Sequence, residues 1–151
     1  MNEDWNEFDS ICPYTDEEAV IALGKLADHP VVLEVSKALF PNEEKEFLRN
    51  VLKNIKSIDE FQMLVMKKAV TWVLDHTAHN FSYDGIGNFK KINGRFLALS
   101  NHRDIILDPA ITQVVLYQNG MQTTEIAVGS NLLSNEYVEA LIRSNRMIKV
   151  I

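Results

Sequence analysis

Thr123 to Ile151, which reads TTEIAVGSNLLSNEYVEALIRSNRMIKVI, is the stretch that decides the expected fold. Residues 123–128 and 147–151 read as short strands, and residues 135–143 between them have the spacing of a helix. A strand, a helix and a strand in this order predict parallel pairing through a right-handed crossover. The last part of the chain is therefore expected to form a βαβ unit.

One further strand and helix are expected before this unit. Residues 95–100 form an apolar run that reads as a buried strand, and residues 109–118 read as a helix that ends before an Asn-Gly pair. Residues 81–94 alternate apolar and polar positions and contain two turn signals, Asp-Gly and Asn-Gly. We therefore expect residues 81–151 to open with β structure and to run strand, helix, strand, helix, strand.

Residues 15–80 have a helical pattern. Thr15 or Asp16 can cap the first helix, and the acidic residues that follow suit the positive end of its dipole. Ser57, with Glu60 three residues later, has the spacing of a capping box. The expected helices run from Thr15 to a break at residues 28–30, over residues 31–40, over residues 43–55 and over residues 58–79.

The two halves together predict the α/β fold class, with an N-terminal helical bundle followed by the first βαβαβ part of an αβ core. We expect a helical subdomain in residues 1–80 and a second domain in residues 81–151, because paired apolar helix faces favour a packed bundle over a flexible leader. The chain stops inside an apolar segment, Met147–Ile151. Either this last strand is the edge of a sheet or the second domain is truncated, and we expect the second.

Composition is that of an ordinary globular domain. The chain has 151 residues, 46% of them hydrophobic and 24% charged, which is enough to bury a sizeable core. A net charge of -6 argues against bulk attraction to nucleic acid or anionic lipid. Cys12 has no second cysteine to pair with, the acidic N-terminus is unlike a signal peptide, and no apolar run approaches the roughly 18 residues of a spanning helix. These features predict a cytoplasmic protein whose membrane contact would be peripheral.

Residues 96–108, FLALSNHRDIILD, hold the candidate site. After the expected strand they bring four polar side chains to one short loop: His102, Arg103, Asp104 and Asp108. Histidine suits proton transfer near neutral pH, and a nearby carboxylate can hold its ring in one tautomer. The same loop also has a purely structural interpretation, because Asp108 before Pro109 is an ordinary pairing at a helix start.

Three segments together resemble the glycerolipid acyltransferases. They are FDSICPYTDEE at residues 8–18, SNHRDIILD at residues 100–108 and TTEIAVGSNLL at residues 123–133. The resemblance covers most of the chain and is to glycerol-3-phosphate and 1-acyl-glycerol-3-phosphate acyltransferases, in the branch found in Bacteroidetes-type bacteria. It implies that residues 81–151 are the N-terminal part of an acyltransferase-like αβ core.

The resemblance implies a reaction in which His102 acts as general base on an acceptor hydroxyl. That hydroxyl would belong to a glycerol-phosphate-type acceptor and would attack the thioester of acyl-CoA or acyl carrier protein during phospholipid synthesis. Because the substrate hydroxyl replaces a protein nucleophile, the reaction requires neither a metal nor another cofactor. Membrane contact would be peripheral, at the inner face, and nucleic acid is not an expected partner.

The carboxylate partner of His102 has two candidates. In the family an acidic residue follows the histidine after four intervening residues, and this chain has Leu107 at that position. Asp108 is the first choice, because it precedes Pro109 at a helix start, as the family's acidic residue does with one residue fewer in the loop. Asp104 is the alternative, because it lies nearer to His102 in the sequence.

The resemblance also implies substrate-binding residues. Arg103 would orient the loop or meet a phosphate, for which guanidinium geometry is suited. Gly129, Ser130 and Asn131 would lie along the acyl or acceptor pocket, although the same three residues are ordinary in a turn between a strand and a helix. The family's arginine-bearing segment and its Glu-Gly-Thr-Arg-like block do not occur in the sequence, so we expect little transfer by these 151 residues alone.

Two other functions are compatible with the sequence. The helices could form a non-catalytic module that binds an acyl carrier protein or another partner, with a structural His-Arg loop. Alternatively, His102 and Asp108 could activate water in a hydrolase. His76 and His79 lie three residues apart on one expected helix, but without a cluster of acidic residues or cysteines beside them they are interpreted as ordinary helix residues rather than metal ligands.

Overall fold

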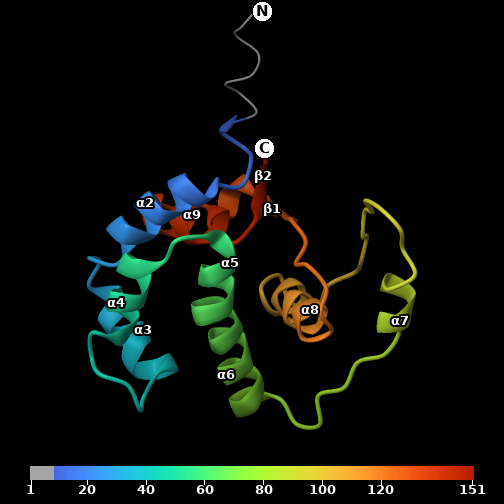
Figure 1. Ribbon diagram of the computed structural model, residues 1–151, viewed down its shortest axis with the longest axis horizontal. Helices are drawn as coiled ribbons and strands as arrows, with labels where there is room; N and C mark the ends of the chain where they lie inside the picture. The colour runs from blue at the N-terminus through green and yellow to red at the C-terminus, as the bar shows by residue number, and fades with distance from the viewer. Residues whose placement is uncertain (1–8) are drawn as a thin grey trace, which may run out of the picture. The chain divides into compact units, whose positions relative to one another are not determined.

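The computed structural model describes residues 9–151, so that Phe8, at the start of the segment FDSICPYTDEE, lies outside the described residues. The chain is mixed α/β and mostly helical, with 53% helix and two short parallel strands in the described part. The order of elements is α2 Asp16–Leu26, α3 Val31–Leu39, α4 Phe47–Asn54, α5 Ile58–Phe61, the π-helix η1 Gln62–Met66, α6 Lys67–Thr77, α7 Ile86–Phe89, α8 Leu107–Gln118, β1 Ile126–Gly129, the 3₁₀-helix η2 Ser130–Leu132, α9 Glu136–Arg143 and β2 Met147–Val150 (Figure 1). The α/β class is confirmed in this coarse form.

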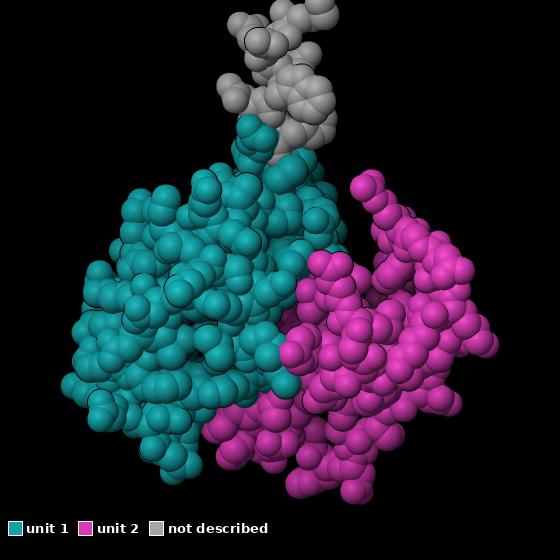
Figure 2. All heavy atoms as spheres, in the orientation of Figure 1, with its two compact units in different colours: residues 1–68, 125–151 teal, residues 69–124 magenta. Residues whose placement is uncertain are grey.

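Contacts divide the chain into two compact units (Figure 2). Unit 1 comprises residues 1–68 and 125–151, and unit 2 comprises residues 69–124. The first helices and the last strands therefore share one unit, which is discontinuous in sequence. The division into domains 1–80 and 81–151 stays a prediction.

The core of unit 1 is built by its helices and contains ten buried apolar side chains. They are Leu23, Leu26, Ala27, Val32, Phe40, Leu48, Leu52, Ile55, Phe61 and Val65. They come from α2, α3, α4, α5 and η1 and from the residues that connect these elements. Burying one such large aliphatic or aromatic side chain contributes about 1.5–3 kcal/mol, so this cluster is the main stabilising feature of the unit.

The first predicted cap is confirmed, and the second is confirmed in part. The Glu18 amide donates to Thr15 Oγ1 at 3.3 Å and the Thr15 amide donates to Glu18 Oε2 at 2.8 Å, a complete capping box. At the start of α5 the Glu60 amide donates to Ser57 Oγ at 3.2 Å, whereas the Glu60 carboxylate accepts from the Lys56 amide. Ser57 is therefore a cap without the reciprocal bond.

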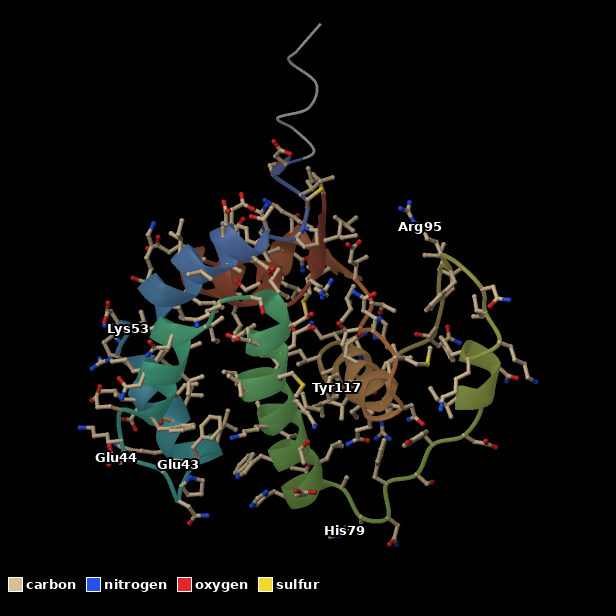
Figure 3. The ribbon with its side chains drawn as sticks, in the orientation of Figure 1. Glu43, Glu44, Lys53, His79, Arg95 and Tyr117 are labelled. Atoms are coloured by element: carbon tan, nitrogen blue, oxygen red, sulfur yellow. The ribbon has the colours of Figure 1, made fainter. Side chains whose placement is uncertain are left out.

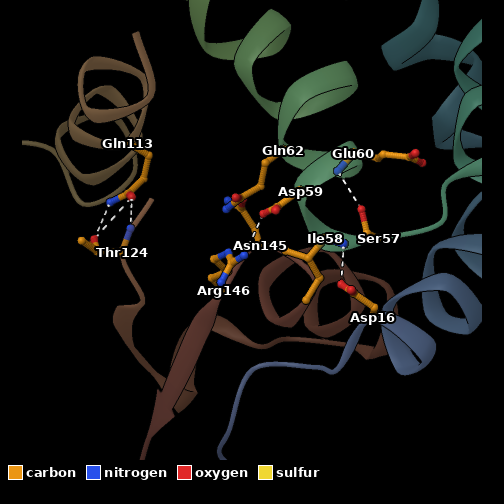
Figure 4. Close-up of polar contacts among 10 residues, drawn as sticks. All are labelled: Asp16, Ser57, Ile58, Asp59, Glu60, Gln62, Gln113, Thr124, Asn145 and Arg146. Carbon is orange, nitrogen blue, oxygen red and sulfur yellow. Dashed lines mark hydrogen bonds and ion pairs between the residues drawn. The ribbon is translucent and has the colours of Figure 1, made fainter. Parts of the chain in front are cut away.

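The long helix predicted over residues 58–79 is present over residues 58–77, but its middle is a π-helix. A π turn adds one residue to the turn and so rotates the following side chains relative to an α-helical face. At this point Gln62 donates to Asn145 Oδ1 at 3.0 Å, and Arg146 pairs with Asp59 at 2.7 Å (Figure 4). Hydrophobic periodicity predicted a helix here but could not show the extra residue.

The βαβ unit predicted at the end of the chain is confirmed. Strands β1 and β2 pair in parallel with Ile126 opposite Met147, and α9 connects them. On the other side of β2, the Lys149 amide donates to the carbonyl of Ile11 at 2.8 Å. The N-terminal segment is thus bound directly to the last strand within unit 1.

A buried arginine fixes the same N-terminal segment to α9. The Arg143 guanidinium donates to the carbonyls of Cys12, at 2.9 Å, and Asp9, at 2.7 Å, and pairs with Glu139 at 3.3 Å. It also lies over the Tyr14 ring, 4.2 Å from its centroid. A charged side chain is rarely buried without partners, and here backbone carbonyls, a carboxylate and a ring provide them.

In unit 2, helix α8 is confirmed over residues 107–118, and the strand predicted over residues 95–100 is wrong. Residues 95–100 have no regular secondary structure, and Leu97 and Leu99 are 84% and 87% exposed. A strand requires a neighbour that pairs with its backbone N–H and C=O groups, and the described residues of unit 2 contain no other strand. The expected β structure over residues 81–94 is also absent; this segment holds the short helix α7.

Candidate functional site

His102 lies in the loop that leads into α8. Residues 101–106 have no regular helix or strand, α8 begins at Leu107, and His102, Arg103 and Asp104 are all exposed. The loop belongs to unit 2. An imidazole in this position is accessible to a bulky reactant, which is a requirement for a general base acting on a substrate hydroxyl.

Two carboxylates close this loop through the backbone. Asp108 Oδ2 accepts from the Arg103 amide at 2.6 Å and from the Asp104 amide at 3.1 Å. Asp104 Oδ1 accepts from the Ile106 amide at 2.8 Å and from the Leu107 amide at 2.7 Å. The second pair satisfies donors at the start of α8 that have no partner inside the helix.

The sequence explains why α8 begins here. Pro109 lies in the first turn, where a missing N–H removes no intrahelical bond, and Asp108 beside it places negative charge near the positive end of the helix dipole. Further along, Val114 and Leu116 are buried. At the other end of unit 2, Gln113 accepts from the Thr124 amide at 2.7 Å.

The electrostatics of the loop act on the pKa of Asp104. The amides of Leu107 and then of Ile106 hold the pKa of Asp104 below its ordinary value, desolvation opposes them, and the charge of His102 adds a smaller lowering effect. Within residues 9–151, the hydrogen bonds of both carboxylates go to backbone amides, and none joins either carboxylate to the His102 ring.

The other predicted site residues lie in the other unit. Gly129 ends β1, and Ser130 and Asn131 form the 3₁₀ turn after it, in unit 1. A Cβ added at Gly129 would lie 2.5 Å from Asn131 Oδ1, so this turn places the amide side chain where any other residue would have to displace it. The structure thus brings His102, Arg103 and Asp104 into one loop, which Asp108 closes from the first turn of α8, and places the Gly-Ser-Asn turn in a different unit.

The two histidines that were considered as metal ligands are His76, which lies in α6, and His79, which follows the end of α6. His76 stacks on Trp72 with ring centroids 4.3 Å apart, and its Nδ1 lies 2.7 Å from the Trp72 carbonyl oxygen. His79 is exposed beyond the end of α6 (Figure 3). No group of three or more His, Cys, Asp or Glu side chains in residues 9–151 is arranged to hold a metal ion.

A hollow in unit 2 was not predicted from the sequence. It has a volume of about 350 Å³ and lies between α6, α8 and residues 81–83, and its lining is Thr71, Leu74, Asp75, Ala78, Phe81, Tyr83, Ile111, Val114, Val115 and Gln118. The only sequence signal related to this hollow was the helical spacing of Leu74 and Ala78 and of Ile111 and Val115, which places each pair on one helix face. That spacing equally describes two helix faces in full contact, so it could not indicate a cavity.

None of the helices in residues 9–151 combines the length and the apolar character that crossing a membrane requires. Comparison of the chain with protein-family models, with curated proteins and with solved structures found no match.

Proposed function

We propose that the chain contributes the acceptor-activating loop of an acyltransferase. The reaction would move a fatty acyl group from acyl-CoA or acyl carrier protein to a glycerol-phosphate-type hydroxyl in phospholipid synthesis. The observation that carries the proposal is the exposed His102 in a loop that Asp104 and Asp108 close against the start of α8. An accessible imidazole on a backbone of defined shape supports a role in proton transfer.

The chemistry requires only the imidazole and the two substrates. His102 takes the proton of the acceptor hydroxyl, the oxygen attacks the thioester carbonyl, and a C–O bond forms while the C–S bond breaks. The proton then passes from the imidazolium to the leaving thiolate, so that no cofactor enters the balance. The partially positive N-terminus of α8 would favour negative charge that develops beside the loop.

Arg103 is the proposed contact for phosphate. Its backbone amide is bound to Asp108, which fixes the start of the side chain, while the residue itself is exposed. A guanidinium can bind phosphate through two parallel N–H groups. The Gly129-Ser130-Asn131 turn is proposed as part of the acyl or acceptor pocket, and a lipid acceptor would bring the protein to the inner face of the membrane.

The test is acceptor-dependent release of thiol from an acyl thioester by the complete natural polypeptide. His102→Ala is expected to lower kcat/KM by about 100-fold or more, because general acid–base catalysis typically contributes 10²–10⁴. His79→Ala is the matched control, since His79 is also exposed and lies outside the loop.

Three results would contradict the proposal in different ways. Full activity of His102→Ala would remove the general-base role. Thiol release that does not depend on an acceptor would indicate a hydrolase. Binding of acyl carrier protein by the natural chain, without acyl transfer at any acceptor concentration, would indicate the helical interaction module instead.

A further inference from the structure

We propose that Asp108 is a positioning residue that acts on the loop backbone as a hydrogen-bond acceptor, and that its negative charge is not the partner of the His102 ring. This inference rests on the proposed function, because it assigns a role within the same loop. It differs from the His-carboxylate pairing that the sequence suggests.

The first support is the identity of the amides that Asp108 binds. The Arg103 amide, 2.6 Å from Asp108 Oδ2, belongs to the peptide unit that joins His102 to Arg103. Holding this peptide plane restricts ψ of His102 and therefore the direction in which its Cα–Cβ bond leaves the backbone. The bond to the Asp104 amide, at 3.1 Å, holds the next peptide unit in the same way.

The second support is that Asp104 also binds the loop backbone, through amides further along the chain. Its Oδ1 accepts from the Ile106 and Leu107 amides, so four hydrogen bonds to two carboxylates define the path from Arg103 to the start of α8. Within the described residues these bonds leave the His102 ring exposed and not hydrogen-bonded to either carboxylate. Orientation of the ring then comes from the backbone that carries it.

The two roles predict opposite effects of one conservative change. Asparagine has the size of aspartate and keeps an acceptor oxygen, but it carries no charge. An acceptor for backbone amides can therefore be replaced by Asn with modest loss, whereas a charged partner of a catalytic histidine cannot: in a Ser-His-Asp triad that change lowers kcat by about 10⁴.

The kinetic test compares Asp108→Asn with Asp108→Ala in the complete natural polypeptide. We expect Asp108→Asn to lower kcat/KM by less than about tenfold, because neutral acceptors form weaker bonds than charged ones. Asp108→Ala should lower it by about 100-fold, the typical effect of misplacing a reacting group by about 1 Å. Asp84→Asn is the matched control, since Asp84 also accepts from a backbone amide, that of Gly85, outside the loop.

Amide exchange provides a readout that requires no activity. In nuclear magnetic resonance spectra of residues 1–151, the Arg103 and Asp104 amides should exchange slowly in the natural chain and in Asp108→Asn, and at least about tenfold faster in Asp108→Ala. The ¹⁵N shifts of the His102 ring, recorded at about pH 8.5 where imidazole is ordinarily neutral, should be the same in Asp108→Asn and the natural chain. A carboxylate bound to the ring would instead fix one tautomer and make these shifts sensitive to the change.

The outcomes separate this inference from the proposed function. A 10³-fold or larger loss in Asp108→Asn, with protected Arg103 and Asp104 amides, would show that the charge acts on the ring and would overturn the inference. Unchanged exchange in Asp108→Ala would overturn it as well. Full activity of His102→Ala would remove the proposed function, while the exchange and ring measurements would still decide what Asp108 holds.

Discussion

Arg143 shows how much of unit 1 depends on a single side chain. Its side chain is 90% shielded from solvent, and its guanidinium binds two backbone carbonyls, Glu139 and the face of the Tyr14 ring. Burial raises the pKa of the Tyr14 hydroxyl, and the charge of Arg143 acts in the opposite direction. Arg143 thus joins the N-terminal segment to α9. The sequence alone shows it only as a basic residue in the last turn of a helix.

Arg143→Met should destabilise the chain by about 1.5–3 kcal/mol, the scale of hydrogen bonds to a charged group, because it removes the charged donor from the carbonyls of Cys12 and Asp9. The measurement is urea-induced unfolding followed by circular dichroism. Lys37→Met is the control: Lys37 forms an exposed ion pair with Glu34, and its loss should cost less than about 0.5 kcal/mol. Equal midpoints for the two variants would contradict the anchoring role.

Asp104 predicts a pH dependence of the loop. Its pKa in the folded chain is below the ordinary value, so the unfolded chain binds its proton more readily. The stabilisation by Asp104 is therefore fully present above the ordinary pKa of about 3.9 and is lost as the pH falls through the lower folded value. We expect the Ile106 and Leu107 amides to lose protection in that acidic window, and Asp104→Asn to abolish this pH dependence; a persisting dependence would assign it to another group.

At the scale of elements, the sequence predicted those that are marked by a clear local signal. Helices α2, α3, α8 and α9 follow from their caps, breakers and spacing, and β1 and β2 follow from their short apolar runs. The π-helix η1 and the coil over residues 95–100 did not follow, because each depends on neighbours in space. An apolar run reads as a strand, but it becomes one only beside another strand.

The exposure of residues 95–100 gives an element-scale prediction. Changing Leu97 and Leu99 together to Ser should alter the free energy of unfolding by less than about 0.5 kcal/mol, because both side chains are already in solvent. Leu116→Ala, in the same unit, should cost about 2–5 kcal/mol, since Leu116 is 2% exposed. If the double variant were as destabilising as Leu116→Ala, residues 95–100 would be a buried strand after all.

At the scale of the whole molecule, unit 1 is assembled from two distant parts of the chain. Residues up to 68 and from 125 are joined by the bond between Ile11 and β2, by Arg143 and by the contact of Gln62 with Asn145. Unit 2 contains the long segment over residues 78–106, in which α7 is the described helix and most side chains are exposed.

Limited proteolysis should report this difference between the units. Trypsin is expected to cleave first after Lys90, Lys91, Arg95 or Arg103, which are exposed and outside α8, and only later after Arg49 or Arg143. After the first cuts, the two parts of unit 1 should still elute together in gel filtration. Their non-covalent contacts within unit 1 do not require an intact chain through unit 2. Early cleavage at Arg143, with residues 90–103 intact, would contradict the burial of Arg143 in unit 1.

The sequence by itself determined helices α2, α3, α8 and α9, the βαβ unit at the end of the chain and the grouping of His102, Arg103, Asp104 and Asp108 around one loop, because caps, periodicity and short spacing act between residues near in the chain. Only the tertiary structure decided that the first and last segments share one compact unit, that residues 95–100 stay exposed, and that the carboxylates bind amides rather than the imidazole. The physical reason is that burial, strand pairing and the choice among hydrogen-bond partners depend on which groups meet in space, and a linear pattern does not specify those meetings.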